Sequence, residues 1–162
     1  MPGTFSAMPV KWMTTQKSLK LLKKEKYGRL ATCGKDLQPY ITPVNFILMD
    51  GRIYFHCGFE GQKIDNLNYN SKVCFEVSRL GKLYPAPHAK NFSNRFWSVL
   101  VFGKARQVKD EKLKLHILNE IMEKYATGHD YAGLTLEDTK TVNIVEITIE
   151  KITGKVSIDP PK

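Results

Sequence analysis

The sequence predicts a mainly β (α+β) fold in which six or so antiparallel strands form a small barrel with flanking helices. Short segments of alternating apolar and polar residues recur along the chain and are separated by residues that favour turns. Asp50-Gly51 lies between two such segments and is a strong signal for a β-hairpin. With 162 residues and 42% hydrophobic content, the chain can bury one core, so residues 1–162 are expected to form a single domain.

The N-terminal part is predicted to contain an arm, a helix and three strands. Residues 1–13 hold two prolines among scattered apolar residues, which predicts an extended arm that packs on a neighbour through Phe5 and Trp12. A helix capped by Thr14 or Thr15 then runs to about residue 26, with leucines among its lysines. Three antiparallel strands follow in a row, at 27–33, 40–49 and 52–57.

The remaining strands and the longest helix lie further along the chain. A short helix beginning near Gly61 is followed by a strand at 72–78 and by a long irregular loop at 80–94. Strand 95–108 is apolar on both faces around residues 98–102, which predicts burial inside a closed barrel or between subunits, and Gly103 indicates a bulge. Asp110 caps a helix with apolar spacing up to Tyr125. A short helix at 135–139 and a strand at 142–149 that continues toward Lys155 complete the chain.

Two local features suggest a ligand site around the predicted hairpin. Pro43 removes a ladder donor from strand 40–49, which predicts an edge or a bulge where something other than a strand approaches the backbone. Glu60-Gly61-Gln62-Lys63 opens a helix, whose first N–H groups and partial positive charge suit an anion such as phosphate. The alternative interpretation is that Gly61 is only part of a helix cap and Lys63 a solvated surface lysine; the pattern allows both.

Charge and cysteine content restrict the class of protein. The formal net charge of +9 favours anionic partners, namely nucleic acid, an acidic membrane surface or a phosphorylated small molecule. The lysine-rich segment 17–26 has no aromatic residue for base stacking, so a solvated helix face is favoured over a nucleic-acid-binding patch. Cys33, Cys57 and Cys74 have no spacing typical of a zinc site or disulfide framework, and no metal site is expected. Because no apolar run reaches the length of a membrane-spanning helix, we expect a cytoplasmic protein.

An ordered series of short motifs resembles a known family. The motifs are GRLAT at 28–32, PY at 39–40, TPVNF at 42–46, DGRIYFH at 50–56, GQKID at 61–65, VCFEV at 73–77 and SVLVFGKA at 98–105. Each motif is weak alone, but the series is collinear over about residues 27–125. It resembles the FMN-binding split β-barrel proteins related to pyridoxamine 5′-phosphate oxidase, within them the nitroimidazole-resistance (Nim-like) branch.

The resemblance implies a fold, an assembly and a cofactor. The fold would be a six-stranded antiparallel split β-barrel with flanking helices, assembled as a homodimer with two FMN sites in the clefts between subunits. Lys63 would contact the phosphate with Gly61 and Gln62 beside it. The backbone of Thr42, Pro43, Val44 and Asn45 would border the isoalloxazine ring, and Ser98 would supply a polar contact to the flavin.

His56 and Cys57 end the strand that the resemblance places next to the flavin. His56 is the candidate catalytic residue, because an imidazole near the ring could donate a proton during reduction or stabilise negative charge. The alternative role for His56 is a hydrogen bond to backbone or phosphate without proton transfer. Cys57 either contacts the flavin or only packs. His88 in the predicted loop is interpreted as solvated rather than as a residue that gates substrate.

The sequence departs from the related oxidases in two respects. Only Lys63 supplies a basic side chain at the phosphate position, although Arg29 or Arg79 could compensate. The late tryptophan and arginine that bind substrate in true pyridoxamine phosphate oxidases are not recognisable after Val142. We therefore expect a different substrate.

The expected function is that of an FMN-dependent oxidoreductase that uses NAD(P)H to reduce a small aromatic or nitro acceptor, as a nitroimidazole reductase does. In such an enzyme the flavin performs the redox step, and the protein places the ring and binds its phosphate. The alternatives are a non-catalytic flavin- or haem-binding protein and, from the charge, a nucleic-acid-binding barrel. Under the main hypothesis the partners are a small-molecule substrate and a second copy of the chain, with no nucleic acid and no membrane.

Overall fold

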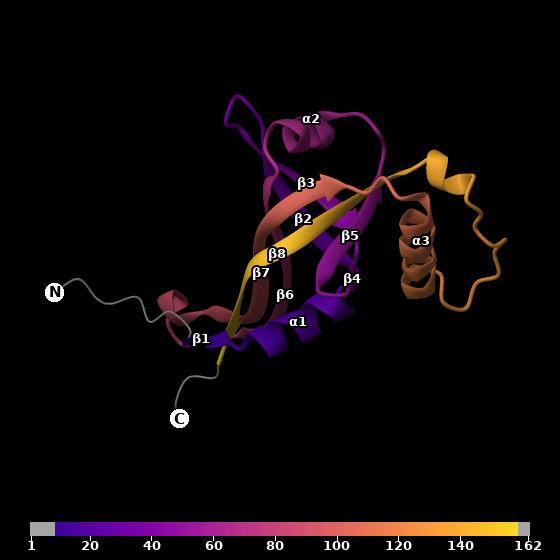
Figure 1. Ribbon diagram of the computed structural model, residues 1–162. Coiled ribbons are helices and arrows are strands. Elements are labelled where there is room, and N and C mark those ends of the chain that lie inside the picture. The colour runs from indigo at the N-terminus through magenta and orange to yellow at the C-terminus, as the bar shows by residue number, and fades with distance from the viewer. Residues whose placement is uncertain (1–8, 159–162) are drawn as a thin grey trace.

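The computed structural model describes residues 9–158, and it contains one antiparallel sheet and three α-helices (Figure 1). The strands are β1 (Val10–Met13), β2 (Tyr27–Cys33), β3 (Pro39–Asn45), β4 (Ile47–Met49), β5 (Arg52–Cys57), β6 (Lys72–Tyr84), β7 (Ser93–Gln107) and β8 (Asn143–Ser157). The helices are α1 (Thr15–Lys24), α2 (Gln62–Tyr69) and α3 (Glu111–Tyr125), with 3-10 turns η1 (Ala89–Asn91) and η2 (Asp138–Lys140). The described part therefore has eight strands rather than the expected six.

The sheet is curled into a half-barrel. Its strand order is β3-β2-β6-β7-β8-β5-β4, with β1 paired to β8, and every pairing is antiparallel. β3 and β4 stand at opposite ends of this order, although only Phe46 separates them in the chain. The chain thus links the two edges of the sheet at Phe46, and the predicted split barrel is confirmed.

The predicted strand at 40–49 is wrong in one respect, because it is two strands. β3 pairs with β2 over its whole length, whereas β4 alone forms the hairpin with β5 through the Asp50-Gly51 turn. Phe46 is fully buried and leaves the strand pattern at the break. Because β3 is an edge strand, its free side tolerates Pro43, which confirms the expected edge position.

The predicted arm and the predicted loop at 80–94 both contain strand. Residues 10–13 form β1 against the end of β8, while Phe5 lies outside the described residues. The loop assignment is wrong, because β6 continues to residue 84 and β7 begins at residue 93, leaving 85–92 as the hairpin connection. Residues 79–83 are exposed and show no two-residue apolar alternation, so only backbone pairing with β7 identifies them as strand.

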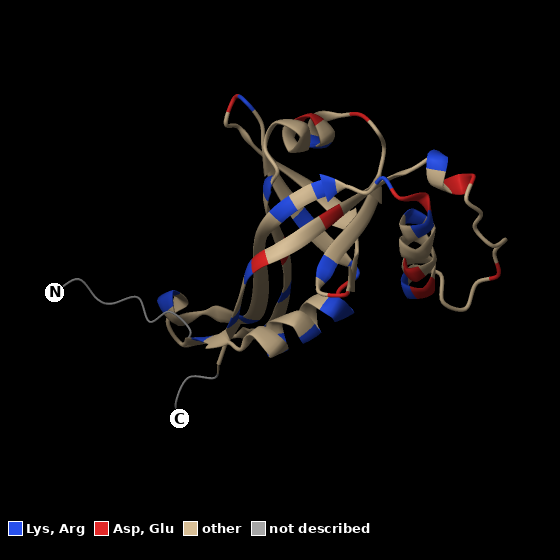
Figure 2. Cartoon of the chain, in the orientation of Figure 1, with Lys and Arg blue, Asp and Glu red and all other residues tan. Residues whose placement is uncertain are grey.

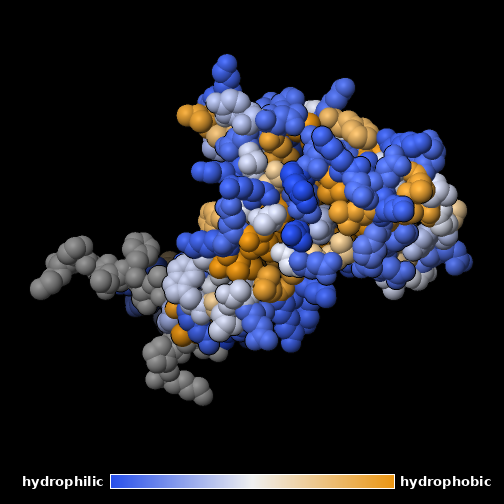
Figure 3. All heavy atoms as spheres, in the orientation of Figure 1, coloured by the Kyte–Doolittle hydropathy of each residue, from blue (hydrophilic) through white to orange (hydrophobic). Residues whose placement is uncertain are grey.

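β7 buries one face and leaves the other partly uncovered. Val99 and Val101 are fully buried in the barrel, whereas Phe102 on the opposite face is 41% exposed. Figure 3 shows apolar residues gathered on the face where β7 and β8 cross. The strand is therefore not enclosed by this chain on both faces. The register of β7 with β8 shifts between Phe102 and Gly103, which confirms the predicted bulge.

Two apolar clusters hold the molecule together. The first fills the barrel, with Phe46 and Phe75 in edge-to-face contact at 4.8 Å between ring centroids. The second lies on the other face of β5 and β8, where Tyr54 and Ile144 pack against α3. α3 is capped by Asp110, whose side chain accepts from the Leu113 N–H at 2.8 Å, as predicted. The predicted helix at 135–139 is only the 3-10 turn η2.

Candidate functional site

A cavity of about 650 Å³ lies where four separate segments of the chain meet. Its lining comes from the end of β3, the end of β5, the first turn of α2 and the segment before β8. The lining residues are Pro43, Val44, Asn45, His56, Cys57, Gly58, Lys63, Thr141 and Val142. Six of these nine were predicted as site residues from the sequence.

The free edge of β3 forms one wall of the cavity. Pro43 and Asn45 are exposed, and Val44 between them points into the barrel core. Within residues 9–158, β3 pairs only with β2, so no strand in this part of the chain covers its other edge. A flat ligand can therefore approach backbone groups that an inner strand would use for pairing.

His56 and Cys57 form the floor at the end of β5. His56 is exposed and is paired in register with Ile144, while Cys57 is half-buried opposite Asn143. Burial raises the pKa of the Cys57 thiol, and the nearby Lys63 ammonium opposes this shift only in part. Cys57 thus stays a neutral thiol at physiological pH, which favours packing over reactivity.

The first turn of α2 forms another wall of the cavity. Gly61 is the N-cap, with a φ of 110° that strongly favours glycine, and no side chain caps the helix there. The Gly61 carbonyl accepts from the Ile64 N–H at 2.8 Å, while Gln62 and Lys63 stand at the first two helical positions, whose N–H groups have no partner within a helix. The Lys63 ammonium lies 5.3 Å from the centroid of the Phe55 ring and lines the cavity. Lys63 therefore brings positive charge to the cavity from the first turn of a helix whose start has no side-chain cap.

Comparison with known proteins identifies the family. Residues 14–156 match the family described as pyridoxamine 5′-phosphate oxidase. The chain belongs to the pyridoxamine 5′-phosphate oxidase family. A curated relative, an uncharacterized protein of Rhizobium meliloti, is 34% identical over 82 residues, and the match spans 50% of this chain and 46% of that protein. The matched region is thus less than half the length of this relative.

Solved structures of the pyridoxamine 5′-phosphate oxidase-like fold include flavin-binding proteins. A candidate 5-nitroimidazole antibiotic resistance protein from Bacteroides thetaiotaomicron is similar with a TM-score of 0.80 and 26% identity, covering 93% of this chain and 89% of that one. The FAD and heme binding protein from Mycobacterium smegmatis has a TM-score of 0.81 at 18% identity, covering 94% and 76%. A flavocytochrome from Azotobacter vinelandii has a TM-score of 0.77 at 22% identity, covering 94% and 71%. The last two show a shared fold.

Four of the predicted site residues in this oxidase-family chain do not line the cavity. Gly61 and Gln62 lie beside Lys63, but the Gln62 side-chain amide is engaged with Asn66 at 2.8 Å. Thr42 is half-buried, and its hydroxyl has no hydrogen-bond partner among residues 9–158. Ser98 is opposite Ser78 and Lys155, toward the other end of the sheet.

Arg29 and Arg79 form ion pairs away from the cavity, so neither adds a second basic side chain beside Lys63. Arg29 forms an ion pair with Glu76 at 2.6 Å, and Arg79 forms one with Glu25 at 2.8 Å. His88 caps η1 at the tip of the β6–β7 hairpin and is exposed. None of these three residues lines the cavity.

Sequence reasoning missed three lining residues of this oxidase-family cavity, Gly58, Thr141 and Val142. Gly58 was noted only as the end of a strand. Thr141 and Val142 lie about 80 residues from the hairpin in sequence, and they reach it because β8 pairs with β5. No local sequence pattern near residues 141–142 indicates that β8 pairs with β5.

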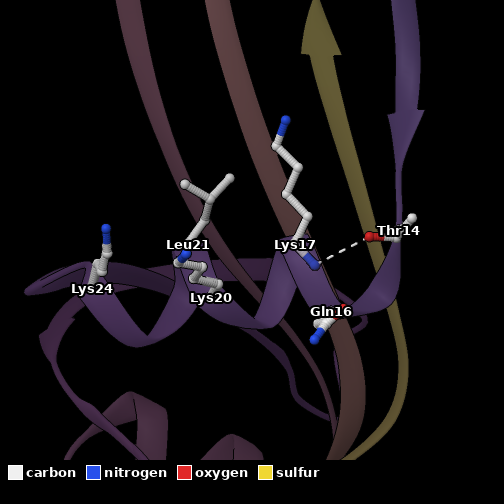
Figure 4. Close-up of a pocket in the computed structure, with 6 residues that line it drawn as sticks. All are labelled: Thr14, Gln16, Lys17, Lys20, Leu21 and Lys24. Carbon is white, nitrogen blue, oxygen red and sulfur yellow. Dashed lines mark hydrogen bonds between the residues drawn. The ribbon is translucent and has the colours of Figure 1, made fainter.

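A second cavity of the oxidase-family chain, of about 530 Å³, lies along α1 (Figure 4). Thr14, Gln16, Lys17, Lys20, Leu21 and Lys24 line it. Lys17, Lys20 and Lys24 are exposed, while Leu22 is fully buried, as predicted for the solvated face of an amphipathic helix. Figure 2 shows that Lys and Arg are spread over α1, the strands and α3 rather than gathered in one place.

Membrane-spanning helices and clustered metal ligands are both absent from the described part of the chain. Within residues 9–158, no helix is both long and apolar enough to cross a lipid bilayer. In the same part of the chain, no group of three or more His, Cys, Asp or Glu side chains is placed to hold a metal ion.

Proposed function

We propose that the chain is an FMN-dependent oxidoreductase that takes electrons from NAD(P)H and reduces a small aromatic or nitro acceptor. The observation that carries the proposal is that one cavity of about 650 Å³ is lined both by Lys63, from the first turn of an uncapped helix, and by an open edge strand. A phosphorylated ligand with a flat ring fits this arrangement, because the lysine and the helix start suit the phosphate and the open edge strand suits the ring. FMN, when bound, supplies the redox chemistry.

The residues of this chain have distinct roles under the proposal. Lys63 and the first N–H groups of α2 bind the phosphate, and Gly61 lets the backbone approach it without a competing side chain. Pro43 and Asn45 border the ring along the edge of β3. His56, exposed on the cavity floor, can hold or transfer a proton at an imidazole nitrogen.

The overall reaction balances without any further reagent. For a nitro acceptor, R–NO₂ and NAD(P)H with one proton give R–NO, NAD(P)⁺ and water, a transfer of two electrons and two protons. One proton comes from solvent, and His56 is the group placed to pass it on. The likeness to a candidate nitroimidazole resistance protein supports an acceptor of this class.

The proposal includes a homodimer with the flavin between subunits. Two observations support it: Phe102 on the outer face of β7 is left 41% exposed by the described residues, and Ser98 lies away from the cavity of its own chain. In a dimer, Ser98 of the partner subunit reaches the flavin. A cytoplasmic location is part of the same proposal, since both substrates are small and water-soluble.

The test is the visible spectrum of freshly purified protein, followed by mixing with NAD(P)H and then with a nitroimidazole. We expect a yellow protein whose released chromophore has the mass of FMN, and whose colour is lost with NAD(P)H and returns with the acceptor. A colourless protein that gains no colour from added FMN would contradict the proposal.

A non-catalytic flavin- or haem-binding protein is the second candidate. It is favoured by the small number of titratable groups in the cavity, which are His56, Cys57 and Lys63. The chain also shares the fold of the mycobacterial FAD and heme binding protein. A bound flavin that NAD(P)H does not reduce would support this candidate over the oxidoreductase.

A further inference from the structure

Helix α3 stands beside the cavity and directs two lysines into the protein. Lys114, near its start, is only 8% exposed, and Lys124, at its end, is half-buried. Lys112 on the same helix is exposed. Lysine is rarely buried unless its charge is paired, so the two inward lysines require an explanation that their helix position alone does not supply.

Lys114 connects two segments at one side of the cavity. Its ammonium donates to the carbonyl of Thr139, a fully buried residue two positions before Thr141 in the lining. The same ammonium lies 5.8 Å from the centroid of the Phe59 ring, and Phe59 directly follows Gly58 in the lining. Lys114 therefore holds the segment before β8 against the loop that leaves β5.

Lys124 acts in the same way next to the β3 wall. Its ammonium donates to the carbonyl of Phe46 at 2.8 Å and to that of Glu25, and it lies 4.3 Å from the centroid of the Phe46 ring. The hydroxyl of Tyr125 accepts from the Phe46 N–H at 2.8 Å. Both peptide groups of Phe46 are thus bound by α3, and Phe46 directly follows Asn45 in the β3 wall.

The partners of both lysines are backbone carbonyls rather than carboxylates. No ion pair of Lys114 or Lys124 with an acidic side chain is found within residues 9–158. A buried ammonium that forms no ion pair is costly even where a carboxylate acts on it at longer range, as Glu25 does on Lys124, and an apolar side chain of similar length would fill the same space at lower cost. What the ammonium adds is a directional, charge-assisted hydrogen bond to a particular carbonyl. These bonds fix the chain at Thr139 and at Phe46, each next to a segment that lines the cavity.

We propose that Lys114 and Lys124 are positioning residues that set the separation of the two cavity walls, and that they thereby control flavin affinity. The inference rests on the proposed function for its ligand but not for its geometry. Neither lysine lines the cavity, so each acts through the backbone that it holds. Helix α3 then holds two segments that border the site, in addition to covering the outer face of the sheet.

The test compares Lys114→Met and Lys124→Met with Lys112→Met as the matched control on the same helix. Hydrogen exchange of the full chain without ligand is followed by mass spectrometry. We expect Lys114→Met to speed exchange at 139–143 and not at 43–47, and Lys124→Met to do the reverse. Exchange in the β6–β7 hairpin is the internal reference, and Lys112→Met should match wild type throughout.

Flavin binding is the second measurement on the same proteins. Each inward variant should weaken FMN binding on the order of tenfold, because a segment that is no longer held must be ordered when the ligand binds. Lys114→Arg, which keeps a donor for the Thr139 carbonyl, should recover most of the affinity.

The outcomes separate the two proposals. If wild type binds no flavin, the proposed function fails, while the exchange pattern still decides whether the lysines hold the walls. Exchange that rises evenly over the whole sheet would mean a general loss of stability and would overturn the positioning role. Wild-type exchange together with wild-type FMN affinity in both inward variants would overturn it as well.

Discussion

The starts of α1 and α2 look similar in sequence but differ in what they offer a ligand. Each begins a lysine-containing helix beside a cavity, of about 530 and 650 Å³ respectively. At α1, the Thr14 side chain accepts from the Lys17 N–H at 3.2 Å, so the helix satisfies that donor itself (Figure 4). At α2, Gly61 has no side chain to do so. The first helix is capped for stability, and the second leaves its donors for an anion.

The surroundings of the two cavities differ as much as their caps. All the residues of the α1 cavity belong to one helix and its cap, and its lysines extend into solvent. The α2 cavity combines four chain segments around a single lysine. The number of lysines beside a cavity therefore says little about whether it is a ligand site. A lysine that lies where several chain segments meet, as Lys63 does, is the better indication.

Lys63→Ala should have the largest effect on ligand binding. Loss of a charged hydrogen bond to phosphate costs about 1.5–3 kcal/mol, which weakens FMN binding roughly 10- to 100-fold. Folding stability should change much less, because Lys63 makes no ion pair among the described residues. Fluorescence titration with FMN gives the affinity, and Lys17→Ala is the control. Equal affinities for the two variants would remove Lys63 from the site.

Gly61→Ala should affect both stability and binding. An alanine at a φ of 110° is strained by roughly 1–3 kcal/mol, although its Cβ would meet no atom within 4 Å. Urea unfolding measures this cost. Gly133→Ala is the matched control, since its Cβ also meets nothing within 4 Å and its φ lies outside the strained range. If the two variants unfold at the same urea concentration, backbone strain is not what requires glycine at the start of α2.

Thr14→Ala should affect stability alone. Loss of the side-chain cap on α1 costs about 1 kcal/mol of unfolding free energy. FMN affinity should equal that of wild type, since Thr14 does not line the α2 cavity. A weaker FMN complex in this variant would show that the start of α1 contributes to binding in the α2 cavity.

The pH dependence of stability tests whether burial lowers the pKa of Lys124. Burial lowers the pKa of Lys124 to about 8, with Glu25 opposing the shift and Lys26 adding to it. Between about pH 8 and 10.5 the folded state has released this proton while the unfolded state still holds it. The contribution of Lys124 to unfolding free energy should therefore rise with pH over that window, by an amount reduced by solvent screening.

Urea unfolding of wild type and Lys124→Met across this pH range isolates that contribution from the other titrating groups. The wild-type minus variant difference should grow as pH increases. A difference that stays flat would show that Lys124 keeps an ordinary lysine pKa and is not desolvated as the structure indicates.

Replacing Lys17, Lys20 and Lys24 together with glutamine should have the smallest effect. These exposed side chains have no role in the α2 cavity, so FMN affinity should be unchanged and unfolding free energy should stay within about ±0.5 kcal/mol per position. Titration with FMN and urea unfolding measure both quantities. A marked loss of FMN affinity would show that α1 contributes to the anion site.

Much of the fold was predictable because it depends on local patterns. Asp110 and the apolar spacing after it predicted α3, and Gly103 predicted the irregularity between β7 and β8, where Glu150 of β8 is the extra residue. Pro43 predicted the edge position of β3. The exposed strand residues 79–83 were assigned to a loop because their pairing with β7 is independent of side-chain pattern.

The candidate site was predictable where glycine, proline and lysine carry chemical meaning by themselves. Pro43 and Lys63 were identified from the sequence, and the structure brings both to one cavity. Thr141 and Val142 could not be identified, since nothing about a threonine and a valine before a strand indicates which distant strand will be its neighbour.

Short-range physics acts within the amino-acid sequence itself: it determined where the chain turns, which segments alternate, and that a helix carrying Lys63 in its first turn would begin near Gly61. The tertiary structure alone decided that the sheet opens at Phe46, that β8 lies beside β5, and that Lys114 and Lys124 turn inward to hold the two walls. The physical reason is that pairing and burial between distant segments depend on the whole packed arrangement, which no local window of residues contains.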